Sequence, residues 1–225
     1  MDLEKPLFIH LIGLEGCGHH GVFPIFEKVL TDKFADSERP LYFQTGLRGM
    51  FNAAYYKGLP RDIVFADVET FLHNNPGAIF VDDNSYPSAT YREPHNQWDF
   101  AEIHARLRDQ CDVRFVRLRR NIFNTINSHR DWDGGLIGHA TVLATIQRSL
   151  DEKIAALTAQ GVPFVDLNYD TIGDDAATIA EITGCEEEAV EAATAALFKP
   201  SQKDYREQMS EDEIGEISRL FKESV

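Results

Sequence analysis

The stretch FIHLIGLEGCGHHGVFPIFEKVL, Phe8 to Leu30, joins an apolar run to a glycine-rich turn and then to a helical pattern. The run Leu7–Ile12 predicts a buried strand, and the segment from Gly18 or His19 to Lys33 predicts a helix. Glycines between a strand and a helix let successive backbone N–H groups converge on an anion without interference from Cβ atoms. The turn therefore predicts an anion-binding loop.

The ending of this loop separates it from the loops of nucleotide hydrolases. Gly13-Leu-Glu-Gly-Cys-Gly18 has the GxxxxG spacing, but His19 and His20 replace the Lys and the Ser or Thr that normally follow. An imidazole can donate N–H groups to an anion, whereas Mg²⁺ prefers oxygen ligands. The loop is therefore not typical of an enzyme that hydrolyses ATP. The alternative to an anion-binding loop is a plain strand-to-helix turn. No metal is expected, because adjacent helical histidines diverge by about 100°.

The remaining apolar patterns predict a repeating alternation of strands and helices. Three further strands are expected at Ala78–Val81, Val113–Leu118 and Val162–Leu167. Helices are expected at Leu47–Tyr56, Arg61–Asn74, Asp99 to about Gln110, Asn121–Arg130, Ile137–Gln160, Thr171–Thr183, Glu186–Leu197 and Ser210–Lys222. This order predicts an α/β fold with a parallel sheet flanked by helices, a three-layer sandwich of the P-loop NTPase type.

In such sheets, ligands bind beyond the carboxyl ends of the strands. The segments expected along that rim are Gly13–His20, Asp82–Ser88, Arg119–Asn121 and Asn168–Asp170. The basic side chain of Arg120 and the hydroxyl of Ser128, eight residues later, can reach one phosphate there. The alternative is that Arg117, Arg119 and Arg120 are solvated charges on an edge strand.

Composition limits the partners and the location. The 225 residues fit one domain, 1–225, with a helical segment from about 171 to 225 packed on it. A net charge of −15 argues against nucleic acid and against an anionic membrane surface as partners. The three cysteines are far apart and predict neither disulfides nor a metal site. The short apolar run near the start predicts no signal or span, so a cytoplasmic location is expected. The sequence sets no oligomeric state.

The motifs together resemble those of the PAPS-dependent sulfotransferases, whose cofactor is 3′-phosphoadenosine 5′-phosphosulfate (PAPS). The family's first signature, similar to GLPRSGTTWL, is matched by Gly13–Val22. The second, similar to FIVLLRDPVDRAVS, is matched by Phe115–Ser128, and a later "YEDL" strand end is similar to Asn168–Ile172. The motifs occur in the family's order and extend over most of the chain from Phe8 to Ile172.

The resemblance implies roles for particular residues. The loop residues implied to hold the 5′-phosphosulfate are Gly16, Cys17, Gly18, His19, His20 and Gly21. Arg120 and Ser128 would hold the 3′-phosphate, and Lys203 or Arg206 would close over it. Tyr169 would approach the adenine, with a core tyrosine that closes the strand as the alternative.

Two departures and the choice of base stay open. The family usually has a basic residue where Gly16 stands, and one of the two loop histidines is a candidate substitute. Asn121 and the next residue replace the family's Asp-Pro. A general base is needed near the acceptor. Asp83, with Asp82 beside it, is the first choice, unless both cap a turn; His20 (or His19) is the second, since an imidazole suits base chemistry at neutral pH.

The expected function is therefore sulfuryl transfer from PAPS to a hydroxyl or amine of a small-molecule or saccharide acceptor, leaving PAP as product. Acceptor contacts are expected from Phe43–Tyr56 and Ser85–Trp98. Two alternatives belong to other classes: a P-loop kinase or NTPase with an altered loop, and a non-catalytic module that binds PAP.

Overall fold

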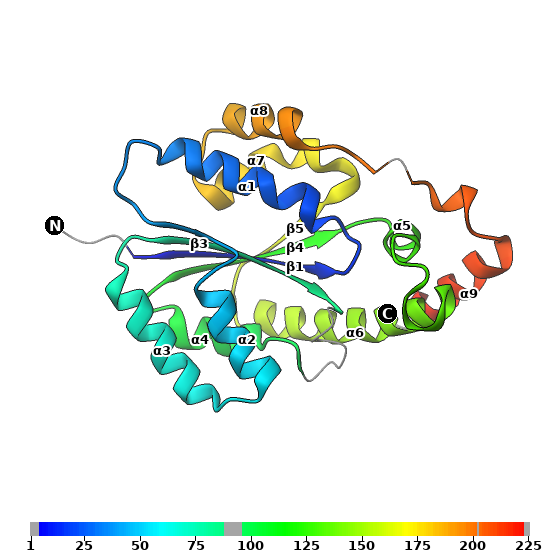
Figure 1. The fold of residues 1–225 in the computed structure, drawn as a ribbon, viewed down its shortest axis with the longest axis horizontal. Helices are drawn as coiled ribbons and strands as arrows, with labels where there is room; N and C mark the ends of the chain where they lie inside the picture. Colours follow the sequence, from blue (N-terminus) through cyan, green and yellow to red (C-terminus); the bar gives the residue numbers. More distant parts are fainter. Residues whose placement is uncertain (1–4, 88–95, 202, 223–225) are drawn as a thin grey trace.

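Five strands form one parallel sheet in the computed structural model, which describes residues 5–87, 96–201 and 203–222 (Figure 1). The strand order is β2-β3-β1-β4-β5. The strands are β1 (Leu7–Leu14), β2 (Leu41–Phe43), β3 (Ile79–Tyr86), β4 (Asp112–Arg119) and β5 (Phe164–Asn168). The predicted α/β class with a parallel sheet is confirmed.

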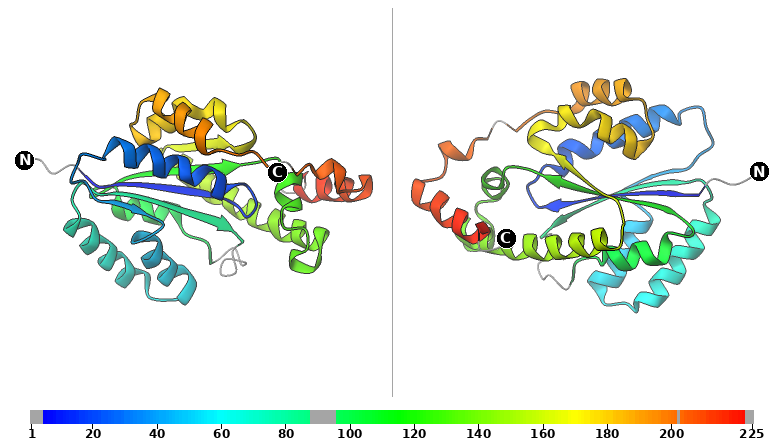
Figure 2. Two further views of the ribbon diagram at one scale, coloured as in Figure 1. Left: turned by 45° about the horizontal axis from the view of Figure 1, so that its top comes forward. Right: turned by 180° about the vertical axis from the view of Figure 1, so that it is seen from behind.

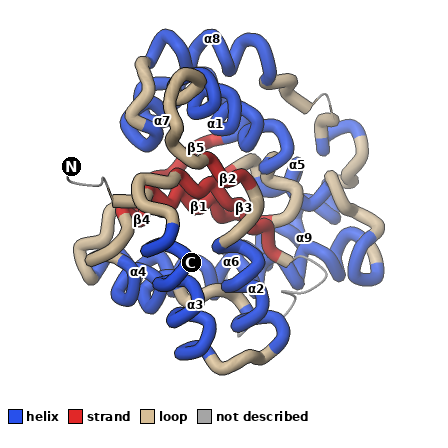
Figure 3. Tube along the Cα trace, turned by 60° about the vertical axis from the view of Figure 1, so that its left-hand side comes forward, coloured by secondary structure: helices blue, strands red, loops and turns tan. Residues whose placement is uncertain are grey.

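Helices cover both faces of the sheet and complete three layers (Figure 3). One face carries α1 (His19–Lys33), α7 (Ala176–Thr183) and α8 (Glu187–Leu197); the other carries α2 (Leu47–Lys57), α3 (Arg61–Asn74), α4 (Phe100–Leu107) and α6 (Leu136–Ala159). Alternate residues of β1 enter the two cores: Phe8 and Ile12 lie in one, Ile9 and Leu11 in the other. Burial on both faces explains why the strand is apolar at almost every position.

The remaining elements lie beyond the carboxyl ends of the strands. They are α5 (Ile122–Asn127), the 3₁₀ turns η2 (Trp132–Gly134), η3 (Tyr169–Asp175) and η4 (Tyr205–Glu207), and α9 (Glu211–Lys222). Figures 1 and 2 show the segment between α8 and α9 passing outside this edge, beside α5. α7 and α8 pack on α1, and α9 packs on α6. Among the helices of the described ranges, none combines the length and apolar character that a bilayer span requires.

The central position of β1 determines where the loop lies. β1 pairs with β3 on one side and with β4 on the other, so Gly13 faces both Ser85 and Leu118. The loop after β1 lies on the rim, as predicted, and the strand order puts it in the middle. Of the predicted rim segment Asp82–Ser88, Ser88 lies outside the described residues, as does part of the predicted acceptor segment Ser85–Trp98.

Two strand predictions need correction. β3 extends to Tyr86, so Asp82 and Asp83 lie within the strand and do not cap a turn after it. They pair in register with His10 and Leu11 of β1. The strand continues through both aspartates because the backbone, not the side chains, forms the hydrogen bonds of the ladder. The short strand β2 was not predicted, because three half-buried residues show no alternation.

Candidate functional site

The loop between β1 and α1 turns on two glycines in the left-handed region. Gly16 has φ 89° and Gly18 has φ 104°. A Cβ atom at Gly16 would overlap Ser128 Oγ, and one at Gly18 would overlap the ring of Tyr169. Both positions therefore require glycine for conformational freedom and for space. The tight contact at Gly16 also leaves no room for the basic side chain that the resembled family has there.

This geometry leaves four backbone N–H groups open. Cys17 N donates to Leu14 O at 3.0 Å, and Glu15 N donates to Tyr86 O at 2.7 Å. The remaining amides, of Gly16, Gly18, His19 and His20, donate to no acceptor among the described residues. Three of them belong to the N-terminal end of α1, where the helix dipole favours negative charge. An anion can satisfy these donors together.

The four residues that carry the open amides line a cavity of about 400 Å³. Its lining comes from the loop, β3, α2 and the end of α5, and consists of Glu15, Gly16, Gly18, His19, His20, Gln44, Arg48, Asp83, Ser85, Ser128 and His129. Gly18 and Ser128, from the two motifs that were expected to grip one ligand, thus share a single cavity. This cavity is called the loop cavity below.

Asp83 and Asp82 differ sharply in their surroundings. Asp83 lines the loop cavity, where its Oδ1 accepts hydrogen bonds from Gln44 Nε2 and Arg48 Nη1, both at 2.9 Å. Its Oδ2 accepts none from the described residues, so a ligand can use it. Asp82 points to the opposite face, because neighbours in a strand alternate. There its carboxyl is fully buried, and desolvation raises its pKa to about 8 against the opposing effect of Arg48.

The two loop histidines also differ. His20 is exposed and lines the loop cavity, so it stays available as a base. His19 is buried, and its Nδ1 lies 3.5 Å from Cys17 Sγ. Burial lowers the pKa of His19. Its Nε2 has no hydrogen-bond partner in the described part of the chain.

Arg120 supports the loop from behind. Its side chain is only 6% exposed. Its Nη1 donates to Gly16 O at 3.0 Å, and its guanidinium lies 4.8 Å from the centre of the Tyr169 ring. Neither Arg120 nor Tyr169 lines the loop cavity. The predicted contact of Arg120 with a phosphate therefore stays a prediction.

Tyr169 packs as a closing tyrosine. Its ring contacts the loop at Gly18 and meets Phe198 edge-on at 4.9 Å. A Cβ atom at Gly21 would lie 3.2 Å from the same ring, so this glycine also lets α1 approach Tyr169. The hydroxyl of Tyr169 accepts a hydrogen bond from Ser201 N at 3.1 Å. These contacts favour the core alternative over a contact with adenine.

A second hollow of about 250 Å³ adjoins the loop cavity through Ser128 and His129, which line both. The other lining residues are Asn127, Arg130, Asp131, Trp132, Lys203 and Gln208. This is called the tail hollow below. Lys203 reaches it because η4 docks on α5: Tyr205 N donates to Asn124 Oδ1 at 3.0 Å, and the Tyr205 and Phe123 rings stack at 4.8 Å. Arg206 is exposed and bonds only Asp204 among the described side chains.

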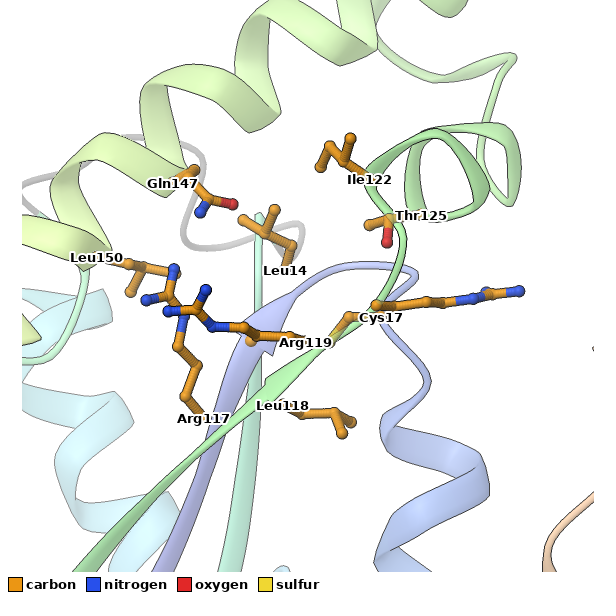
Figure 4. A pocket seen from close by; sticks show the side chains of 11 residues that line it. Leu14, Cys17, Arg117, Leu118, Arg119, Ile122, Thr125, Gln147 and Leu150 are labelled. Carbon is orange, nitrogen blue, oxygen red and sulfur yellow. The ribbon is translucent and has the colours of Figure 1, made fainter. Parts of the chain in front are cut away.

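The side chain of Cys17 faces a third, smaller hollow of about 140 Å³ on the other side of the loop. Figure 4 shows Arg117 and Arg119 reaching from β4 toward Leu150 of α6. Each arginine is neutralised by an aspartate, Arg117 by Asp151 at 2.5 Å and Arg119 by Asp166 at 2.9 Å. Burial strongly raises the pKa of the Cys17 thiol, so Cys17 contributes to the loop through its backbone.

Five cavity residues had no predicted role of their own: Glu15 lies within the loop motif, Gln44, Arg48 and Ser85 lie within the predicted acceptor segments, and His129 follows Ser128. The signal for His129 was that position, because a helix end at the rim places both side chains near the loop. No three His, Cys, Asp or Glu side chains in the described ranges are grouped so as to hold a metal ion.

No protein-family model matches the chain, and no curated protein matches its sequence. Among solved structures, the chain is similar to the sulfotransferase domain from the Synechococcus PCC 7002 olefin synthase. That similarity has a TM-score of 0.44 and 12% identity, and it covers 98% of this chain and 96% of the other. The chain is also similar to the sulfotransferase domain from the curacin biosynthetic pathway, with a TM-score of 0.43 and 12% identity. This similarity covers 90% of this chain and 80% of the other. At this level neither similarity assigns a family or an activity.

Proposed function

We propose that this chain is a sulfotransferase that uses PAPS and sulfates a hydroxyl or amine of a small-molecule or saccharide acceptor. One observation carries the proposal: Ser128 lines both the loop cavity, with its four open amides, and the tail hollow, with Lys203. Two places suited to anions are thus joined at one hydroxyl. A nucleotide with charged groups at its 5′ and 3′ positions matches that arrangement.

In this proposal, the amides of Gly16, Gly18, His19 and His20 hold the 5′-phosphosulfate. The bound donor supplies an activated sulfuryl group. The same amides are already aimed at the position where negative charge develops on the leaving phosphate, so no reorganisation is needed during the reaction. Lys203 holds the 3′-phosphate, which distinguishes this nucleotide from ATP, and Ser128 donates to it by turning its hydroxyl hydrogen away from Thr125 O, its acceptor in the free protein. Arg120 and Tyr169 keep the loop in shape from the buried side.

The acceptor occupies the part of the loop cavity that β3 and α2 form. Asp83 lies there with an Oδ2 that accepts no hydrogen bond from the described residues, while Arg48 and Gln44 fix the carboxylate through Oδ1. Asp83 Oδ2 accepts the proton of the acceptor hydroxyl or ammonium group as general base. His20 is the second candidate for this role, because it lines the same cavity and is exposed.

Ligand-dependent unfolding tests the proposal on the full chain. We expect 3′,5′-ADP to raise the melting temperature more than 5′-AMP or ATP·Mg²⁺ does, because only 3′,5′-ADP fills both anion places. At 100 times its dissociation constant, a ligand adds about 2.7 kcal/mol of stability. Stabilisation by ATP·Mg²⁺ alone would contradict the proposal. Selective binding of 3′,5′-ADP without sulfate transfer to any acceptor of a broad panel would instead identify a non-catalytic module.

A further inference from the structure

The anion-binding loop carries a carboxylate of its own. Glu15 lines the loop cavity beside the open amides, and its side chain is 19% exposed. One carboxylate oxygen, Oε2, accepts a hydrogen bond from Ser85, and the other, Oε1, lies 3.7 Å from His129 Nε2. An anion that enters the cavity meets this negative charge at short range, which opposes binding unless a positive charge compensates for it.

His129 is placed to supply that charge. Its ring lines both the loop cavity and the tail hollow, and its Nδ1 would lie only 3.3 Å from a Cβ atom built at Gly16. The imidazole therefore stands directly beside the loop backbone whose amides are open. Its side chain is 25% exposed, so it can exchange a proton with solvent.

The hydrogen bonds around His129 indicate where its proton belongs. Ser128 Oγ donates to Thr125 O at 2.7 Å, so its oxygen can only accept from His129 Nδ1 at 2.9 Å. Nδ1 therefore carries a hydrogen in the neutral ring, and the bare Nε2 faces the Glu15 carboxylate. Two acceptors face each other in that state. A second proton, on Nε2, turns this contact into a charge-assisted one.

We propose that His129 is a further ligand-binding residue of the loop cavity, which takes up a proton on Nε2 when an anion binds. Glu15 and His129 together then make anion binding proton-coupled. This inference rests on the proposed function only in requiring an anion in the loop cavity; it does not require a nucleoside.

The charged groups around His129 come from each element that packs on it. Glu15 of the loop raises its pKa, whereas His20 of α1, His139 of α6 and Lys203 of the tail lower it. Asp133 in turn bonds His139 at 3.0 Å. Desolvation is the largest influence, and the net effect is a pKa below the ordinary value. His129 is therefore mainly neutral at pH 7.5 in the free protein, and anion binding must be accompanied by the uptake of a proton from solvent.

The sulfate ion is a suitable probe, because it stays a dianion from pH 6 to pH 8.5. We would measure its dissociation constant across this range by NMR titration of the full chain, and follow the ring resonances of His129 with and without sulfate. If one proton is taken up, the dissociation constant rises by about tenfold per pH unit above the pKa of His129. Sulfate should also raise the pKa of His129 in the unmodified protein, a readout that needs no variant.

Three variants assign the proton. His129→Gln should abolish the pH dependence, whereas His73→Gln, at the exposed end of α3 beside the start of β3, should leave it unchanged. His20→Gln tests the rival imidazole in the same cavity, and the pH dependence should persist in this variant. Glu15→Gln should tighten sulfate binding at pH 8 and flatten the pH dependence, because the repelling charge is gone.

Four outcomes would overturn the inference: a pH dependence that persists in His129→Gln, one that disappears in His20→Gln instead, a dissociation constant independent of pH, or no sulfate binding at any pH. The proposed function fails separately. If 3′,5′-ADP binds no better than 5′-AMP while sulfate binding still depends on His129, the inference stands and the function does not. If 3′,5′-ADP binds selectively while sulfate binding keeps its pH dependence in His129→Gln, the proposed function stands and the inference does not.

Discussion

Gly16 is the residue on which the shape of the loop depends. Its φ of 89° disfavours any side chain, and a Cβ atom would meet Ser128 Oγ and, at 2.5 Å, Thr125 O. We expect Gly16→Ala to lower the free energy of unfolding by about 1–3 kcal/mol and to weaken 3′,5′-ADP binding. Urea unfolding and ligand titration would measure the two effects.

Gly215 provides the matched control for Gly16. It lies within α9 with no atom near its would-be Cβ, so Gly215→Ala should be neutral or stabilising by up to about 1 kcal/mol. If Gly16→Ala behaves like Gly215→Ala, the loop tolerates a side chain and its described geometry is wrong.

Asp83 is the residue expected to limit turnover. Asp83→Asn keeps the shape of the side chain but removes its basicity, so sulfate transfer should fall by roughly 100-fold or more. Affinity for 3′,5′-ADP should change little, because the amides and Ser128 hold that ligand. Asp112→Asn, at an ion pair with Arg114 at the start of β4, is the control and should alter neither quantity. Unchanged turnover in Asp83→Asn would transfer the base role to His20.

Asp82 makes stability depend on pH. Its folded-state pKa of about 8 exceeds that of the unfolded chain, so the folded state holds a proton that the unfolded state has lost. The stabilisation is complete below the unfolded pKa and decreases as the pH rises toward 8. Between pH 5 and pH 7.5, we expect the unfolding free energy of the unmodified protein to fall by about 2–3 kcal/mol relative to Asp82→Asn. If the unfolding free energies of the two proteins, measured in urea, change with pH in parallel, Asp82 is not held protonated in the folded state.

At the residue scale, the sequence predicts the features that depend on residue spacing, but few of those that depend on tertiary contacts. The glycines of the loop follow from their spacing between a strand and a helix. Arg48 lies in a predicted acceptor segment, but its bond to Asp83 and the place of His129 in the loop cavity arise from tertiary packing, which no local pattern marks. The difference between Asp82 and Asp83 depends on strand parity, which becomes visible only once β3 is known to continue through them.

At the element scale, the caps of two helices near the sheet edges can be compared directly. Asn121 caps α5 by accepting from Phe123 N and Asn124 N, and Asp99 caps α4 by accepting from Glu102 N. Asn121→Ala and Asp99→Ala should each cost about 1 kcal/mol of stability. Only Asn121→Ala should also weaken 3′,5′-ADP binding, because α5 positions Ser128. If both variants bind 3′,5′-ADP equally well, Ser128 does not contact the ligand.

Element predictions succeeded where burial imposes a long periodic pattern. α3 was expected at its observed bounds, and the helix expected from Asp99 does begin there, with Asp99 as the N-cap of α4. The end of β3 was placed too early because Asp82 and the polar residues after it are typical of a turn. Their backbone is nevertheless held by the ladder to β1, and pairing between positions 72 apart, such as His10 and Asp82, leaves no local signal.

At the scale of the whole molecule, the tail completes the tail hollow by docking on α5. Tyr205→Ala removes the stack on Phe123, so the segment from Lys203 to Lys222 should exchange its amide hydrogens faster. Binding of 3′,5′-ADP should weaken because Lys203 is no longer held near Ser128. Arg219→Ala, at an exposed position of α9, is the control and should leave both exchange and binding unchanged. Normal binding in Tyr205→Ala would exclude Lys203 from the ligand.

The global architecture was predictable because alternating strands and helices allow few arrangements. The order of the strands was not, and neither was the full set of residues that line the loop cavity. Residues of the cavity come from the loop, β3, α2 and α5, and their meeting is a consequence of packing two helical layers on one sheet.

The place of β1 between β3 and β4 also constrains how the chain is made. Its two partners begin at Ile79 and Asp112, so a ribosome finishes β1 long before either one exists. During that interval, the segment LFIHLIGL has two unsatisfied edges and an apolar surface, features that favour aggregation. A nascent chain halted before β4 should therefore be bound by chaperones that recognise apolar segments, and should release them only after residue 119 has emerged.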